Sequence, residues 1–226
     1  MNILVTGASG YIGSILVPKL LKQGHKVTAI DRFFFGDTLP DDSNLIKIKS
    51  DARDFDTVLM NNIDAVIDLV AISNDPAGDV CEDATYAINF KSRFKTASLT
   101  KKSGVQRYIL PSSCSIYGFQ EGDFIAREDS KTNPLTHYAK ANEMAEKEIL
   151  PLANQDFCVT VLRQATVFGY SPRMRFDLAI NGMTYGAWIN RSLPLMRDGK
   201  QWRPMIHVSD TSDAIIFMLN QDPSDI

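Results

Sequence analysis

Residues Asn2–Gly13, NILVTGASGYIG, determine the fold that we expect for this chain. The apolar run at its start predicts a short buried strand, and Gly7, Gly10 and Gly13 lead this strand directly into an amphipathic helix. Glycines at this spacing allow a tight turn, close approach of a pyrophosphate and close packing of the helix on the sheet. The free amides at the start of the helix attract phosphate. The stretch therefore predicts a phosphate-binding turn, although three glycines alone also fit an ordinary turn.

The second predicted strand indicates which nucleotide would bind. Lys26–Ile30 (KVTAI) is followed by Asp31, about twenty residues beyond the glycines. A carboxylate at this strand end accepts hydrogen bonds from the adenosine ribose hydroxyls and repels a 2′-phosphate, which predicts NAD as the cofactor. Arg32 would instead attract a 2′-phosphate, so NADP stays open as the alternative.

Length and composition exclude several classes of function. The chain has 226 residues, a hydrophobic fraction of 44% and a net charge of -3, which fit one sizeable domain, alone or with a small appendage. The charge predicts neither a nucleic acid nor a membrane as partner, and we expect no secretory signal or membrane span. The three cysteines are scattered and lack metal-ligand spacing, so we expect a cytoplasmic protein without a metal site.

Further apolar strands alternate with helical stretches along the chain. They are predicted at Leu45–Lys49, Ala65–Ile72, Arg107–Leu110 and Phe157–Leu162. This alternation is typical of an α/β domain with a doubly wound parallel sheet. After Gly169 the pattern changes: residues 176–191 and 210–220 read as helices, the second with Asp210 as its N-cap. We therefore expect a cofactor-binding domain over residues 1–169, and a small, minimal or incomplete lobe over residues 170–226 that is interleaved with it.

Two further stretches carry candidate chemical groups. The fifth strand leads into PSSCSIYG, and in a doubly wound sheet this places Ser112, Ser113 and Ser115 at the carboxyl edge, beside the glycine turn. A hydroxyl at that edge can assist proton transfer, or it can simply cap the strand end. Tyr138 begins the helix HYAKANEMAEKEIL, where a rigidly held phenol can act as acid or base, although tyrosines at such positions usually serve packing.

As a set, these motifs resemble the extended short-chain dehydrogenase/reductases, and among them the NAD-dependent epimerase/dehydratase group that acts on nucleotide sugars. The resemblance is carried by TGASGYIG, the Asp31 strand end, SDARD (residues 50–54), DLVAIS (68–73), SSCSIYG, Tyr138 with Glu146, RQATVFG (163–169) and WRPMIHVSD (202–210). It implies a Rossmann-like fold, a nucleotide-sugar substrate, and a homodimer formed through the helices at residues 81–103 and 137–154.

The resemblance also implies roles for individual residues. Ser113 and Tyr138 correspond to the catalytic hydroxyl residues, and Asn142 to a third catalytic position. The residues implied in cofactor binding are Gly7, Ser9, Gly10, Tyr11, Ile12, Gly13, Asp31, Arg32, Asp51, Ala52, Leu69, Val70, Ala71, Asn89, Tyr138 and Asn142. Those implied in substrate binding are Ser73, Cys114, Ser115, Asn181 and Arg203.

Two departures from the family pattern affect the expected activity. Dehydratases of the family carry an Asp-Glu pair where this chain has Cys114 and Ser115, so dehydration is disfavoured. The family lysine, which binds the nicotinamide ribose and lowers the pKa of the tyrosine, is replaced by Asn142. We expect a nucleotide-sugar epimerase; the alternatives are a keto-sugar reductase or dehydratase, and an impaired NAD-binding sensor. Replacing Asn142 by lysine is predicted to raise turnover at neutral pH.

Overall fold

The computed structural model describes residues 1–54, 56–120, 125–193 and 202–222. Its main feature is a six-stranded sheet in the order β3-β2-β1-β4-β5-β6, in which all neighbouring strands are parallel. The chain order reverses between β1 and β4, and this switch point is where doubly wound sheets bind their ligands. The strands are β1 (Asn2–Thr6), β2 (Lys26–Asp31), β3 (Leu45–Lys49), β4 (Ala65–Asp68), β5 (Arg107–Ser113) and β6 (Cys158–Gln164).

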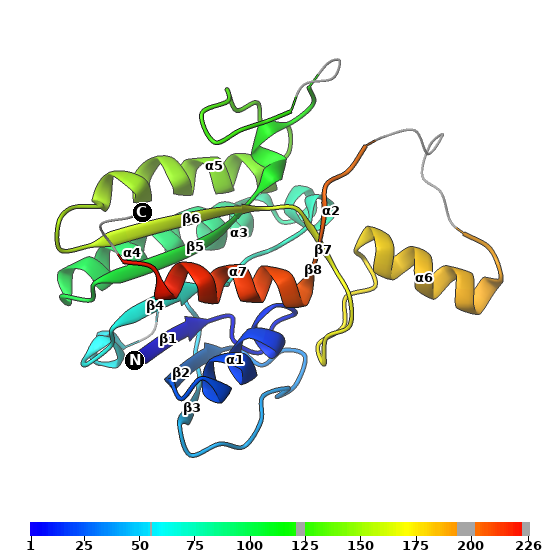
Figure 1. Cartoon of the computed structure of the whole chain (residues 1–226). Helices are drawn as coiled ribbons and strands as arrows, with labels where there is room; N and C mark the ends of the chain where they lie inside the picture. The colour runs from blue at the N-terminus through cyan, green and yellow to red at the C-terminus, as the bar shows by residue number, and fades with distance from the viewer. Residues whose placement is uncertain (55, 121–124, 194–201, 223–226) are drawn as a thin grey trace.

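Helices cover both faces of the sheet (Figure 1). Successive residues of a strand point to opposite faces, so Ile3 and Val5 of β1 join the core beneath α1 (Gly13–Lys22) and α7 (Val208–Asn220), while Leu4 joins the core on the other face. That second core contains residues of α4 (Arg93–Lys102) and α5 (His137–Ile149). Because apolar residues occupy both faces of the central strands, their sequences read as continuous apolar runs, and the predicted doubly wound α/β fold is confirmed.

Two strand boundaries differ from the predicted ones. The run predicted as a strand from Ala65 to Ile72 is a strand only to Asp68. The chain then leaves the sheet, because the Asn89 side chain binds both the amide and the carbonyl of Ile72. β5 in turn is longer than expected and reaches Ser113, paired with β6 along its whole length.

Several short helical segments connect the main elements. They are η1 (Thr57–Met60), α2 (Asp75–Val80), α3 (Glu82–Tyr86), the π-helical turn η2 (Ala87–Ser92), η3 (Cys114–Tyr117) and η4 (Leu150–Leu152). The predicted N-cap of the last helix was wrong, since α7 starts at Val208 and its cap is His207, whose Nδ1 accepts a hydrogen bond from the Ser209 amide. Within the described ranges, every helix is too short or too polar to span a lipid bilayer.

The chain beyond residue 169 contributes to two places. β7 (Thr166–Phe168) pairs with β8 (Met205–His207) in a separate two-stranded sheet, and α6 (Ala179–Asn190) stands apart from the main layers (Figure 1). α7, in contrast, returns to the main core through Ile215 and Leu219. The division at residue 169 stays a prediction, and residues 194–201 and 223–226 of the expected lobe lie outside the described residues.

Candidate functional site

The glycine turn between β1 and α1 leaves room and hydrogen-bond donors for a phosphate. Gly7 has φ +64, and a Cβ there would lie 2.9 Å from the carbonyl carbon of Leu69 on the neighbouring strand end. A Cβ on Gly13 would lie 2.3 Å from the carbonyl oxygen of Ala8, so the helix could not sit this close to the turn. Among the described residues, the amides of Tyr11, Ile12 and Gly13 have no hydrogen-bond acceptor. The turn therefore fits the diphosphate of a dinucleotide.

The end of β2 presents the predicted carboxylate. Asp31 accepts hydrogen bonds from the Ser9 amide (2.9 Å) and the Phe33 amide (2.7 Å), which orient the carboxylate toward the glycine turn. Each oxygen keeps a lone pair for a ribose hydroxyl. Arg32 pairs with Asp51 at 3.0 Å. The pKa of Asp51 is lowered to about 2, mainly by the hydrogen bonds from Arg53 and to a smaller extent by the charge of Arg32. Because Arg32 is already engaged by a carboxylate, the geometry favours NAD over NADP.

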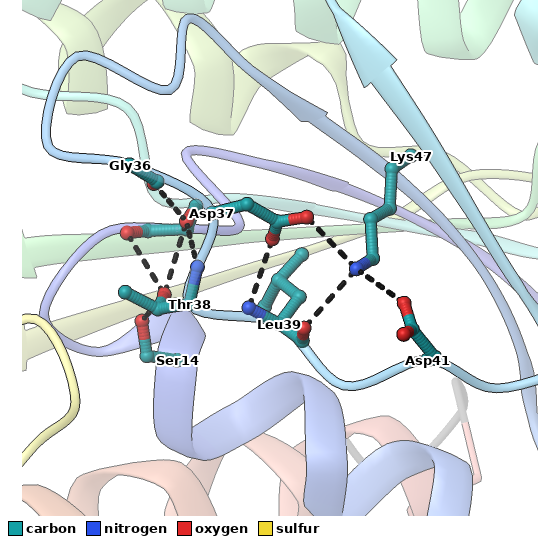
Figure 2. A network of polar contacts seen from close by, with 8 residues as sticks. Ser14, Gly36, Asp37, Thr38, Leu39, Asp41 and Lys47 are labelled. Atoms are coloured by element: carbon teal, nitrogen blue, oxygen red, sulfur yellow. Dashed lines mark hydrogen bonds and ion pairs between the residues drawn. The ribbon is translucent and has the colours of Figure 1, made fainter.

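Hydrogen bonds hold the loop after β2 against the start of α1 (Figure 2). The Thr38 hydroxyl bonds to the hydroxyls of both Ser9 (3.0 Å) and Ser14. From β3, Lys47 Nζ donates to the carboxylates of two loop residues, Asp37 (2.8 Å) and Asp41 (3.3 Å). These contacts join β3, the loop and α1, and they use the Ser9 side chain, which was predicted to bind the cofactor. The sequence carried no signal for them beyond a turn-rich composition.

The segment that was predicted to line the cofactor, Leu69–Ala71, follows β4 and is half-buried. Asn89 is fully buried beneath it, with its amide bonded at 2.8 Å to both main-chain groups of Ile72. The Asn89 side chain therefore positions this segment and has no surface left for a direct contact with a ligand. Ala52, also predicted to bind the cofactor, is buried after β3.

The serines after β5 have different surroundings. Ser112 is buried and donates to Glu146, which also pairs with Arg163 at 2.8 Å, so this serine anchors α5 rather than facing the crevice as expected. Ser113 is half-buried, and its hydroxyl accepts a hydrogen bond from the Ser115 amide at 3.2 Å. The Ser115 hydroxyl is buried without a partner among the described residues.

Tyr138 lies in the first turn of α5, two residues after the N-cap Thr136. α5 packs against β5 and η3, which brings the tyrosine to the same edge of the sheet as Ser113. On its other side lies α2, where a Cβ on Gly78 would come within 3.2 Å of the Tyr138 Cβ. The glycine thus lets α2 pack directly on the tyrosine.

Asn142 does not lie open toward a ligand, contrary to the expectation that it hydrogen-bonds a ribose. Its side chain is 1% exposed, Oδ1 accepts a hydrogen bond from Arg93 Nη1 at 2.6 Å, and Nδ2 donates to the Tyr138 carbonyl at 2.8 Å. Arg93 is itself buried at 3% exposure, and its Nε donates to the Val70 carbonyl at 3.1 Å. Sequence reasoning missed Arg93, and its neighbours, the polar Ser92 and the apolar Phe94, gave no signal that it is buried.

Asn181 was predicted to bind the substrate diphosphate, but its amide joins parts of the protein. Oδ1 accepts from the Gly169 amide (3.0 Å), and Nδ2 donates to the Tyr11 hydroxyl (3.0 Å) and the Arg175 carbonyl (2.9 Å). The Tyr11 hydroxyl in turn donates to the Gly169 carbonyl at 2.6 Å. Arg175, a second residue missed from the sequence, donates to the Ser73 hydroxyl at 2.6 Å. These contacts connect the glycine turn to the chain beyond β7.

A cleft of about 440 Å³ lies beside α6 and includes Asn181 in its wall. Its lining is mostly aromatic and apolar: Phe168, Tyr170, Met174, Phe176, Ile180, Tyr185 and Trp188. Near η3, burial raises the pKa of the Cys114 thiol, and the charge of Arg203 opposes this shift. Arg203 is exposed, so its guanidinium is accessible to an anionic ligand. Within the described ranges, no cluster of three or more His, Cys, Asp or Glu side chains could hold a metal ion.

Comparisons with known proteins agree with this geometry. The chain is 29% identical to an uncharacterized UDP-glucose epimerase, YtcB, from Bacillus subtilis (strain 168), over 98% of this chain and 73% of the relative. It is 29% identical to a probable UDP-arabinose 4-epimerase 3 from Oryza sativa subsp. japonica, over 100% of this chain and 64% of that relative. The solved structure of MoeE5 in complex with UDP-glucuronic acid and NAD superposes with a TM-score of 0.88 at 30% identity, covering 98% of this chain and 73% of that one.

The chain therefore spans roughly two thirds to three quarters of the length of these relatives. The family model described as the NAD dependent epimerase/dehydratase family matches residues 3–226. This match confirms the predicted family and its NAD cofactor. The chain belongs to the NAD-dependent epimerase/dehydratase family.

Proposed function

We propose that this chain carries the catalytic machinery of an NAD-dependent nucleotide-sugar epimerase. The observation that carries the proposal is the shared position of Ser113, Tyr138 and the glycine turn at the carboxyl edge of one parallel sheet. The relatives named as UDP-glucose and UDP-arabinose epimerases support it.

The cofactor would be held by main-chain and carboxylate groups. The amides of Tyr11, Ile12 and Gly13 bind its diphosphate, and Asp31 binds the adenosine ribose. The half-buried segment Leu69–Ala71 lies on the other side of the glycine turn and lines the nicotinamide half. When bound, NAD supplies a hydride acceptor and donor for a ring carbon of the sugar.

Side chains of the protein transfer the proton of the sugar hydroxyl. Tyr138 removes the proton of a sugar hydroxyl while the ring carbon is oxidised, and Ser113 hydrogen-bonds the same oxygen as it becomes a carbonyl. After the keto-sugar presents its opposite face, Tyr138 returns the proton to the oxygen, and the alcohol is restored with inverted configuration. Atoms and electrons balance without an external reductant.

The substrate would lie on the side of β7 and α6. We propose that Arg203 binds the diphosphate of the nucleotide and that the aromatic cleft beside Asn181 receives its base. Ser73, Cys114 and Ser115 would border the sugar. Neither the thiol nor the hydroxyl supplies the carboxylates that elimination of water requires, so epimerisation is favoured over dehydration.

Incubation of the purified chain with a panel of UDP-sugars tests the proposal. We expect one of them to be converted to its epimer without added NADH, as followed by proton NMR of the anomeric signals, and Tyr138→Phe to abolish the conversion. A strict requirement for stoichiometric NADH would contradict it in favour of a keto-sugar reductase. NAD binding without conversion of any UDP-sugar would favour the sensor, for which the replacement at Asn142 is the motivating observation.

We further propose a cytoplasmic homodimer. The free thiols of Cys81, Cys114 and Cys158 fit a reducing compartment. On the outer side of α5, Met144 is exposed and available to a second copy across the face that α4 and α5 form together. Light scattering coupled to size-exclusion chromatography would measure the mass; a monomer at all concentrations would contradict the dimer.

A further inference from the structure

The position where the family carries a lysine is linked in this chain to a buried arginine from another helix. Arg93 begins α4, directly after the π-helical turn η2, and such turns are frequent at functional sites. Its guanidinium reaches α5, where Nη1 donates to Asn142 at 2.6 Å. Tyr138 is on the same helix, one turn before Asn142.

The charge of this guanidinium is not neutralised by a contacting carboxylate. Among the described residues, Arg93 has no ion pair, and its side-chain hydrogen bonds go to two neutral oxygens, those of Asn142 and Val70. A guanidinium has five N–H donors, and a buried cation with so few acceptors is costly. Nη2 has no partner among the described residues and is not one of the fully enclosed unpartnered atoms, so it keeps some accessible surface. A bound molecule could provide an acceptor there.

The groups around Arg93 show where that acceptor would lie. Val70, whose carbonyl the guanidinium holds, belongs to the segment beside the glycine turn, and Asn142 belongs to the helix of Tyr138. The other ionisable groups nearby are Asp68 of β4 and Tyr108 of β5, which bond to one another at 2.7 Å. Burial holds the pKa of Tyr108 well above its usual value, so Tyr108 stays neutral, and Asp68 is occupied by it and by Thr6.

We propose that Arg93 takes over the role of the missing lysine: it binds the nicotinamide ribose of the cofactor and brings a positive charge to the helix that carries Tyr138. Asn142 then serves as a positioning residue, because its carbonyl oxygen holds the guanidinium and its amide nitrogen holds the first turn of α5. The catalytic half of this inference rests on the proposed epimerase activity; the cofactor-binding half does not.

Binding measurements test the cofactor half. Isothermal titration calorimetry would give the affinities for NAD and for ADP, which lacks the nicotinamide ribose. Arg93→Met removes the charge at similar length, Arg93→Lys keeps it, and Lys102→Met removes a charge from the exposed end of the same helix as a matched control. We expect Arg93→Met to weaken NAD about tenfold or more while ADP changes less than about twofold. Lys102→Met should change neither.

Equal changes for both ligands, or none, would overturn the proposal, because a contact with the nicotinamide ribose is present in the NAD complex and absent from the ADP complex. If Arg93→Met does not fold, Arg93→Gln carries the test, since it keeps hydrogen-bond donors for the Asn142 and Val70 oxygens without the charge. We expect it to weaken NAD more than ADP, and equal changes in the two affinities would count against Arg93.

The rate of epimerisation tests the catalytic half. With the substrate found in the panel, Arg93→Met should lose more activity at neutral than at alkaline pH, and Arg93→Lys should recover part of the neutral activity. A uniform loss across pH would refute the electrostatic role. If the wild-type chain converts no UDP-sugar, the proposed function fails, while the ratio of NAD to ADP affinity still decides whether Arg93 binds the ribose.

Discussion

Replacing Asn142 by lysine should destabilise this protein, although the sequence alone predicts a gain in turnover. The variant places an ammonium next to the Arg93 guanidinium, at a position where the wild-type atoms are 2.6 Å apart and both side chains are at most 3% exposed. Two like charges about 4 Å apart repel by about 4 kcal/mol at an effective dielectric constant near 20. The lost hydrogen bond from a charged donor adds about 2 kcal/mol.

A loss of this size would be a large fraction of the stability of an ordinary domain, about 5 to 15 kcal/mol. At about 2 to 4 °C per kcal/mol for a chain of this length, Asn142→Lys should melt at least about 10 °C below wild type. Asn142→Ala, which loses the hydrogen bond without adding a charge, should lose only about 2 kcal/mol.

A double-mutant cycle isolates the interaction between the two side chains. With Arg93→Met in the background, both the repulsion and the Arg93–Asn142 hydrogen bond are already absent, so Asn142→Lys should cost about 6 kcal/mol less than it does alone, as measured by urea unfolding followed by circular dichroism. If the lysine costs the same in both backgrounds, or if the single variant melts within about 2 °C of wild type, the two side chains do not interact as described.

Three other perturbations test the rest of the site. Gly13→Ala should lower stability by about 2 kcal/mol and weaken NAD binding, since the new Cβ meets a carbonyl oxygen at 2.3 Å; thermal melting and calorimetry would show both effects. Glu146→Gln leaves Arg163 without its buried counter-charge and should cost about 3 kcal/mol in urea unfolding. Asp51 has a pKa lowered to about 2, so it contributes at most about 2 kcal/mol above pH 4 and loses this as the pH falls toward 2; the difference in melting temperature between wild type and Asp51→Asn should shrink over that range.

Each of these has a contrary outcome. Unchanged NAD affinity in Gly13→Ala would show that the helix can move without disturbing the turn. For Glu146→Gln the control is Glu148→Gln, an exposed neighbour on the same helix, and equal losses in both would contradict the buried pair. A difference at Asp51 that grows on acidification would reverse the sign required by a lowered pKa.

The fold was predictable because its signals are local. The apolar runs of β1, β2 and β3 and the glycines between β1 and α1 each impose their structure within a few residues, and alternation of strands and helices leaves few other topologies. The strand end at Asp68 was not predictable, because it depends on Asn89, which lies about twenty residues further along the chain.

The sequence by itself determined the doubly wound sheet, the family and the candidate groups Asp31, Ser113 and Tyr138, because motif and spacing specify which chemical groups stand at strand ends and helix starts. Only the tertiary structure showed that Arg93 lies against Asn142, since the two residues are 49 positions apart in the chain and belong to different helices. The spacing from Tyr138 along its own helix shows that the family lysine is replaced at position 142. Whether another side chain supplies its charge depends on how the helices pack, and packing is a property of the whole fold.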